Sequence, residues 1–432
     1  MVIVYVLLAL AVPAVLVAAN WYLWRRLFRD TTTGPGRARR VGAVVIAGGW
    51  ILAVGALVAE RAGAPFLLQR VLAWPGFLWM ALSIYLLLAV LAGEVVRPLL
   101  RRVLDRRAPR PAAVTPSPAG SAASAEPAPE PGSSPEPASS PEPEPTPRAE
   151  PAAPAQPAPS RRLLVSRAVA GAAAAAAVGT VGYGTYGVLR GPRVKRVTVP
   201  LAKLPRAAHG YRIAVVSDIH LGPVLGRGFA QTVVDTVNST RPDLIAVVGD
   251  LVDGSVKDLG PAAAPLAQLE ARHGSWFVTG NHEYFSGAEQ WVAEVRRLGL
   301  RPLENARAEL PWFDLAGVND VTGEREGHGP DYAKALDDRD TARACVLLAH
   351  QPVQIHEAVR HGVDLQLSGH THGGQLWPGN FIAAAANPTL AGLDRYGDTQ
   401  LYVSRGAGAW GPPTRVGAPS DITVIELAST RA

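Results

Sequence analysis

Polar side chains that can bind metals follow five short apolar runs in the C-terminal half of this 432-residue chain. They are carboxylates, an amide and imidazoles, and they occupy positions Asp218, His220, Asp250, Asn281, His350, His370 and His372. Seven O and N donors exceed the needs of one four-coordinate ion and suit two metals that share a carboxylate. We expect Asp250 to be shared, because its two oxygens place negative charge between two cations. The donor set admits Mn, Fe, Zn or Ni.

Such a pair of ions would hydrolyse phosphate esters. Two divalent ions about 3.5 to 4 Å apart acidify a water between them and stabilise the phosphoryl oxygens during in-line displacement. His282 is next to Asn281 but is not needed as a ligand, so it can donate a proton or a hydrogen bond to the leaving alkoxide. No Ser or Cys with a neighbouring base is evident, and we therefore expect no covalent intermediate.

The apolar runs that precede these residues are short enough to be strands. They lie at 213–216, 244–248, 276–278, 345–349 and 363–367. Near-continuous apolarity suits sheets that are covered on both faces, and helical patterns at 229–239 and 288–298 lie between the runs. This alternation predicts an α/β layered fold. The carboxyl ends of its strands would converge on one crevice and bring the donors together.

The ordered blocks DIH, GDLVD, GNHE, AH and GHTH resemble the signature of calcineurin-like metallophosphoesterases. The segments SGHTHGGQ and YVSRGAG are similar to those of the bacterial membrane-associated branch of that family. The resemblance covers about residues 200 to 430. It implies a double β-sheet sandwich flanked by helices, with two divalent metal ions, Mn, Fe or Zn, at the strand ends.

The resemblance also implies a role for each residue. The expected ligands of the first ion are Asp218, His220, Asp250 and His372. Those of the second ion are Asp250, Asn281, His350 and His370. His282 would contact the phosphoryl group and help the leaving oxygen depart. Glu283 stands where many relatives have Asp, and we expect Asp253 to orient a ligand or cap a turn.

The first half of the chain predicts a membrane module. Four apolar, uncharged stretches are long enough to cross a bilayer, at 2–24, 41–59, 75–93 and 168–189. We interpret the first as a retained helix, because no basic residue precedes it and three Arg follow it. The connections 25–40 and 97–110 each carry six Arg, which predicts that both are cytoplasmic and that the N-terminus is outside.

The segment 108–160 holds 17 Pro, six Glu and no aromatic residue, which predicts a disordered linker. The expected domains are therefore a three-helix membrane module at 1–107, this linker, a fourth transmembrane helix at 161–190 and a catalytic domain at 197–432. Arg161 and Arg162 resemble a twin-arginine export signal, although an ordinary cytoplasmic helix flank has the same pattern. Either interpretation puts the catalytic domain outside the cell, while the basic residues at 190–196 weaken the charge bias.

Charge and cysteine content exclude other classes of protein. Residues 1–200 carry 22 Lys or Arg against 10 Asp or Glu, and the remainder carries 20 against 26. The acidic second half argues against nucleic-acid binding there. The single cysteine, Cys345, excludes a disulfide framework within the chain and a multi-thiolate metal site.

The sequence leaves the substrate open. Arg405 and Arg415 could pair with a phosphate or form structural salt bridges. The apolar segment 381–386, with Trp377 nearby, could face lipid or lie in the core. Some relatives are similar to enzymes that cleave the pyrophosphate of UDP-diacylglucosamine. We therefore expect a lipid- or nucleotide-linked phosphodiester or pyrophosphate as the substrate and the bilayer as a partner. The alternatives are a phosphomonoesterase, a protein phosphatase or a catalytically silent scaffold.

Overall fold

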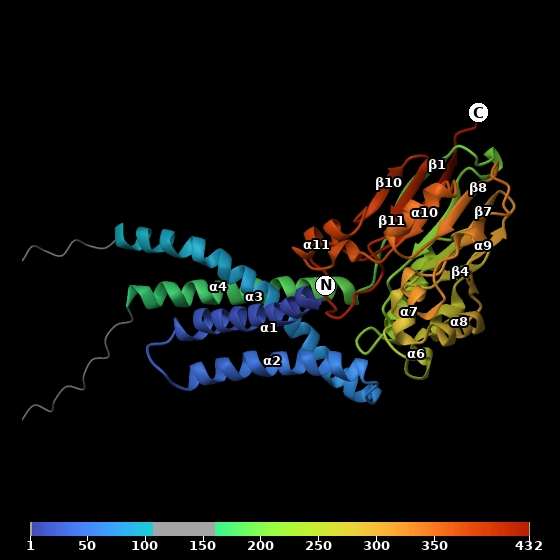
Figure 1. Ribbon diagram of the computed structural model, residues 1–432. Coiled ribbons are helices and arrows are strands. Elements are labelled where there is room, and N and C mark those ends of the chain that lie inside the picture. The colour runs from blue at the N-terminus through green and yellow to red at the C-terminus, as the bar shows by residue number, and fades with distance from the viewer. Residues whose placement is uncertain (1, 107–159, 432) are drawn as a thin grey trace, which may run out of the picture.

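The computed structural model describes residues 2–106 and 160–431 (Figure 1). The linker expected at 108–160 lies outside the described residues, except for Ser160, which caps the helix that follows. The described chain forms a bundle of long helices followed by a unit of two β-sheets with helices around them (Figure 1).

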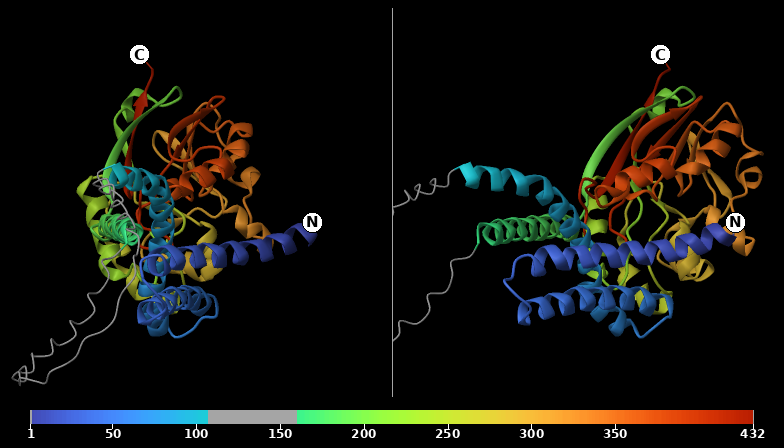
Figure 2. Two further views of the ribbon diagram at one scale, coloured as in Figure 1. Left: turned by 90° about the vertical axis from the view of Figure 1, so that its left-hand side faces the viewer. Right: turned by 60° about the vertical axis from the view of Figure 1, so that its left-hand side comes forward.

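The bundle contains α1 (Val2–Trp24), α2 (Arg37–Arg61), α3 (Phe66–Arg106) and α4 (Arg161–Leu189). A π-helical turn, Arg25–Arg29, follows α1 directly. The helices share a common direction in Figure 1, whereas the left view of Figure 2 shows α1 projecting sideways from the other helices toward its N-terminal end. Their buried apolar side chains form one core, with members on every helix: Leu23, Ile46, Ala81, Tyr85, Leu86, Val90, Ala173, Ala177 and Val181.

Three helices in the described part of the chain are long and apolar enough to cross a membrane: α2, α3 and α4. The first expected span coincides with α1, but the side chains at the start of α1 are outside the described set. The helix α3 is longer than the expected span at 75–93. Glu94 explains part of the extension, because it pairs with Arg26 of the neighbouring turn at 2.8 Å and with Arg97 at 3.4 Å. The charge of Glu94, just beyond the apolar stretch, is thus neutralised within the bundle.

The second unit is built on two six-stranded sheets. The first sheet has the strand order β1-β12-β2-β3-β4-β5. Its strands are β1 (Arg193–Leu201), β12 (Asp421–Ser429), β2 (Tyr211–Val216), β3 (Leu244–Val248), β4 (Ser275–Val278) and β5 (Arg301–Pro302). The strands β2, β3, β4 and β5 are mutually parallel, whereas β12 is antiparallel to β2.

The second sheet has the strand order β10-β11-β9-β8-β7-β6. Its strands are β10 (Gly392–Tyr396), β11 (Thr399–Val403), β9 (Leu365–Ser368), β8 (Ala344–Leu348), β7 (Phe313–Gly317) and β6 (Ala306–Glu309). The four central strands are parallel, and the edge strands β6 and β10 are antiparallel to their neighbours. All five predicted strands are present, as β2, β3, β4, β8 and β9.

Apolar side chains from both sheets meet in a common core, which includes Ile213, Val215, Phe313, Leu315 and Leu367. Helices pack on the outer faces. They are α5 (Arg227–Ser239), α6 (Val256–Ala263) and α8 (Ala288–Arg297) on the first sheet, and α9 (Tyr332–Leu336) and α10 (Ile355–Arg360) on the second. Two further helices, α7 (Asn281–Ser286) and α11 (Gly379–Ala386), lie in connections. The predicted double-sheet α/β fold is therefore confirmed.

The bundle packs directly on this α/β unit. Val188 at the end of α4 belongs to the core beneath the first sheet. The Thr185 and Thr414 hydroxyl oxygens are 2.7 Å apart, and the Tyr85 hydroxyl donates to the Trp377 carbonyl at 2.9 Å. The chain leaves the bundle at the end where the N-terminus also lies (Figures 1 and 2).

Candidate metal centre

The seven predicted donors lie in loops at the carboxyl ends of strands from both sheets. Asp218 and His220 follow β2, Asp250 follows β3, and Asn281 opens α7 after β4. His350 follows β8, and His370 and His372 follow β9. Five of them have left-handed backbone, with φ between 50° and 72°: Asp218, His220, Asp250, His370 and His372. Such strain in non-glycine residues is costly and typical of functional sites.

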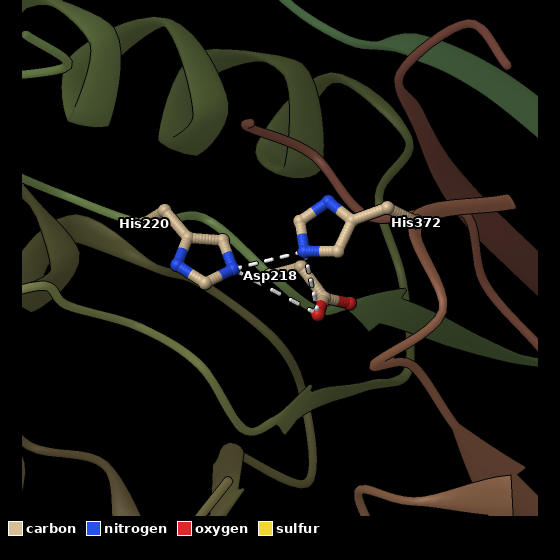
Figure 3. Close-up of side chains that lie close together, drawn as sticks. All are labelled: Asp218, His220 and His372. Atoms are coloured by element: carbon tan, nitrogen blue, oxygen red, sulfur yellow. Dashed lines mark hydrogen bonds and ion pairs between the residues drawn. The ribbon is translucent and has the colours of Figure 1, made fainter. Parts of the chain in front are cut away.

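The first group of donors consists of Asp218, His220 and His372, which point toward one another (Figure 3). The Nε2 atoms of His220 and His372 are 3.0 Å apart, and His372 Nε2 is 3.4 Å from Asp218 Oδ1 (Figure 3). Ser217 donates to the other Asp218 oxygen at 2.5 Å, which leaves Oδ1 directed at the imidazoles.

The second group brings together Asp250, Asn281, His350 and His370. Asn281 Oδ1 lies 3.2 Å from His350 Nε2 and 2.9 Å from His370 Nδ1. The Asp250 Oδ2 atom lies 3.2 Å from the same His350 nitrogen. The backbone amide of His370 donates to the Asp218 carboxylate at 3.0 Å, so a hydrogen bond links the two groups of donors.

Asp250 lies between the two groups. Its Oδ2 atom is 3.7 Å from His220 Nε2 on one side and 3.2 Å from His350 Nε2 on the other. The carboxylate is buried, and the imidazoles of His220, His282, His350 and His370 lie around it. Buried O and N donors without thiolate, facing one another from two sides of a carboxylate, fit a pair of divalent cations.

Hydrogen bonds fix the orientation of two of these imidazoles. His220 Nδ1 donates to Asp253 at 2.9 Å, and His350 Nδ1 donates to the Val248 carbonyl at 2.9 Å. A proton held at Nδ1 leaves the Nε2 lone pair free for a metal, and such outer partners set the tautomer of ligating histidines. Both Nε2 atoms face Asp250.

Asp253 also contacts His282, and it therefore orients two imidazoles. His282 Nδ1 is 2.7 Å from Asp253 Oδ1, in the wall of the same cleft. Burial lowers the pKa of His282, but the hydrogen bond and charge of Asp253 outweigh burial and raise that pKa to about 9. Burial likewise raises the pKa of Asp253, yet the charges of His220 and His282 hold it at about 2.

Glu283 has a role that the sequence did not reveal. Its carboxylate accepts hydrogen bonds from the amides of Asp250, Leu251 and Gly280 at 3.0, 2.8 and 2.6 Å. The side chain is fully buried, and it joins the loop after β3 to the loop after β4. The one sequence signal that placed Glu283 near the site was its position in the GNHE block.

Two glycines permit the close approach of these loops. A Cβ atom at Gly280 would collide with the Asp250 carboxylate, and one at Gly369 would collide with Ser217 and Asp218. Any larger residue at either position would displace an expected ligand.

Neither arginine considered for phosphate binding lines the cleft. Arg415 is buried and donates to the carbonyls of Gly408 and His372 at 2.6 and 3.1 Å, so it supports the His372 loop. Arg405 lies near Asp421 at 4.0 Å. The structural alternative for both was a salt bridge; Arg405 is placed for one with Asp421, whereas Arg415 supports the His372 loop through carbonyl groups.

The segment 381–386 forms most of α11, and its side chains are not part of the core. None of the eight residues of α11, all within the described part of the chain, is buried. Phe381 and Ile382 are 65% and 76% exposed, and Trp377 just before the helix is 48% exposed. The helix lies beside the bundle at the end nearest the α/β unit (Figure 1).

The metal-binding groups open into a cleft of about 460 Å³. One wall carries the expected ligands His220, Asp250 and Asn281 together with His282. The opposite wall belongs to the bundle, where Leu57 and Phe77 approach the site. The cleft is thus formed jointly by the two parts of the molecule.

Comparison with known proteins agrees with this geometry. Residues 211–374 match the family model described as calcineurin-like phosphoesterase. An uncharacterized metallophosphoesterase of Aquifex aeolicus is 36% identical over 240 residues, which are 54% of this chain and 91% of that protein. The chain therefore belongs to the calcineurin-like phosphoesterase family, and its α/β unit is a metallophosphoesterase domain.

A Danio rerio protein described as a transmembrane protein with metallophosphoesterase domain is 40% identical over 259 residues. The Bos taurus protein of the same description is 40% identical over 253 residues. These matches cover 57% and 55% of this chain, and they span 59% and 57% of the length of the two relatives.

Proposed function

We propose that this protein is a membrane-anchored, dinuclear-metal phosphoesterase. One divalent cation would be held by Asp218, His220, Asp250 and His372, and the other by Asp250, Asn281, His350 and His370. When bound, the pair supplies an activated water and positive charge for the phosphoryl oxygens. The observation that carries this proposal is the position of Asp250 Oδ2, 3.7 Å and 3.2 Å from histidines of opposite groups.

His282 and its neighbours would act on the leaving group of the substrate. His282 lines the cleft, and its Nδ1 atom is 2.7 Å from Asp253 Oδ1. An imidazole at this place can donate a proton or a hydrogen bond to the leaving oxygen of the substrate. The centroids of the Trp410 and Phe285 rings lie 5.7 and 5.5 Å from that of the His282 ring, and both rings pack edge-on against it.

The substrate that we propose is a phosphodiester or pyrophosphate linked to a lipid or a nucleotide. Two features support a substrate that approaches from the bilayer. The exposed apolar helix α11 lies beside the helices that are long enough to span a membrane (Figure 1). Residues of α2 and α3 also line the cleft that contains the metal-binding groups.

We propose that the catalytic domain lies on the extracytoplasmic side. The Arg-rich connections 25–40 and 97–110 favour a cytoplasmic location for the far end of the bundle. The α/β unit lies at the opposite end, where the N-terminus also lies (Figure 1).

The full chain in detergent tests the activity. It is freed of metal, reloaded with Mn, and assayed on bis-p-nitrophenyl phosphate and p-nitrophenyl phosphate. We expect hydrolysis of the diester that disappears in the Asp250→Asn variant and remains in Asp235→Asn, an exposed carboxylate on α5. Preference for the monoester would favour a phosphomonoesterase. Metal-loaded protein that cleaves neither compound would favour the silent scaffold.

A further inference from the structure

The end of α2, the turn after it and the start of α3 (residues 57–77), together called the α2–α3 connection, line part of the metal cleft. Leu57, Glu60 and Arg61 at the end of α2, and Phe77 on α3, line the cleft opposite His282. These residues are more than 130 positions away in sequence from the first expected ligand, Asp218. The part of the chain described as a membrane anchor thus contributes a wall to the proposed active site.

Packing holds this wall in place. Phe77 is buried with Ala56 and Ala73 in a small cluster at the base of the α2–α3 connection. Val224, from the loop between β2 and α5, packs against that cluster. Phe66, the first residue of α3, packs against the core beneath the first sheet. The α2–α3 connection is therefore docked on the α/β unit and does not merely pass near it.

Arg61 is the one Lys or Arg among the described residues that line the cleft. Its side chain is exposed, and the neighbouring Glu60 carboxylate, which also lines the cleft, interacts with its charge. An exposed guanidinium in the wall of a phosphoesterase cleft suits an anionic oxygen of the substrate, because Arg binds phosphate groups well. Leu57, which is 38% exposed, offers apolar surface next to it.

We propose that the α2–α3 connection selects the substrate, and that this substrate is an amphiphilic phosphate ester that lies in the bilayer. Arg61 binds an anionic oxygen of its phosphate, while Leu57 contacts its apolar chain. This inference rests on the proposed phosphoesterase activity and adds the substrate class and the residues that recognise it.

Two substrates with the same scissile bond test the proposal in the full chain. They are hexadecyl p-nitrophenyl phosphate and ethyl p-nitrophenyl phosphate. With either one, water adds to phosphorus, the P–O bond to the aryl group breaks, and p-nitrophenolate leaves with an alkyl phosphate as the other product. The readout is kcat/KM for each compound in identical micelles, expressed as the ratio of long-chain to short-chain ester.

The variant Leu57→Ala removes apolar contact from the cleft, and Leu67→Ala is its control, an exposed leucine of α3 outside the cleft. We expect Leu57→Ala to lower the ratio by about tenfold, the scale of lost apolar contact in a pocket. Leu67→Ala should leave the ratio unchanged, which controls for partition of the long-chain ester into micelles.

The charged contact has its own matched pair, Arg61→Ala and Arg70→Ala, because Arg70 is exposed on α3 and does not line the cleft. We expect Arg61→Ala to raise KM for both esters, Arg61→Lys to restore part of the loss, and Arg70→Ala to have no effect. Hydrolysis of both esters with an unchanged ratio in Leu57→Ala and an unchanged KM in Arg61→Ala would refute this inference and leave the phosphoesterase proposal standing. Hydrolysis of neither ester by the wild-type chain would refute both.

Discussion

Individual residues of this site follow from the sequence when their role depends on type and local spacing. All seven expected donors lie together, because each comes directly after an apolar strand whose end faces the same edge. Glu283 escaped prediction, because the amides of Asp250 and Leu251 that it accepts from belong to a loop that is distant in sequence. The sequence predicted that Asp253 orients a ligand. Only the folded chain shows that its carboxylate contacts both His220 and His282.

The shared carboxylate of Asp253 predicts a specific defect. In Asp253→Asn, the amide oxygen still accepts a hydrogen bond but no longer carries the charge that holds His220 and His282. We expect a loss of about tenfold to 100-fold in phosphodiesterase activity or in metal affinity, the usual effect of removing such a partner. Metal titration and steady-state kinetics measure it, with Asp235→Asn as the control. An Asp253→Asn variant with wild-type metal affinity and activity would contradict the role.

Cys345 should be chemically inert in the folded protein. It lies fully buried in β8, and burial raises the pKa of its thiol to about 12. The thiolate is the reactive form, so almost none is present at pH 8. We expect iodoacetamide to leave Cys345 unmodified in the native chain at that pH and to modify it after denaturation, as measured by mass spectrometry. Rapid labelling of the native protein would show that β8 is accessible.

At the level of elements, five central strands were predictable, whereas the central strands β7, β11 and β12 and the edge strands were not. The five predicted runs became strands that are fully buried or nearly so, and near-continuous apolarity marks such strands. β10 has no buried residue among its five described positions, and β1 has only two buried residues of nine. Strands that are exposed on one face carry mixed residues, so apolarity alone does not find them.

The docking of α4 gives a prediction at this scale. A Cβ atom at Gly184 would lie 2.7 Å from the Arg415 carbonyl and 2.8 Å from Thr414 Cγ2, whereas Gly182 has nothing within 4 Å. Gly184→Val should therefore push α4 away from the loop that carries Arg415 and disturb His372. We expect a lower melting temperature and weaker metal binding than in Gly182→Val, which is the matched control. Equal behaviour of the two variants would show that this contact does not support the site.

The whole molecule combines parts whose sequences suggested separate tasks. The apolar stretches indicated membrane helices, and the polar blocks indicated a catalytic domain. Their joint cleft was not predictable, because Leu57, Arg61 and Phe77 meet the metal-binding groups only through long-range packing of α2 and α3. Apolar residues at helical spacing indicate that a helix is buried in lipid or protein, but they do not say which surface it lines.

The proposed orientation can be tested on intact cells. If the catalytic domain is extracytoplasmic, protease added to intact cells, with any outer barrier removed, should degrade the domain. A cytoplasmic marker protein should stay whole in the same sample. Immunoblotting against the C-terminal half follows both. Protection of the domain until the cells are lysed would place it inside and would overturn the orientation.

The central claim is that two cations are held through one shared carboxylate, Asp250. The most direct measurement is the content of divalent metal per chain, by elemental analysis of full-length protein purified without chelators. The account predicts about two ions per wild-type chain, about two in Asp235→Asn and fewer than about one in Asp250→Asn. A wild-type chain that holds no metal, or an Asp250→Asn chain that retains both ions, would contradict it.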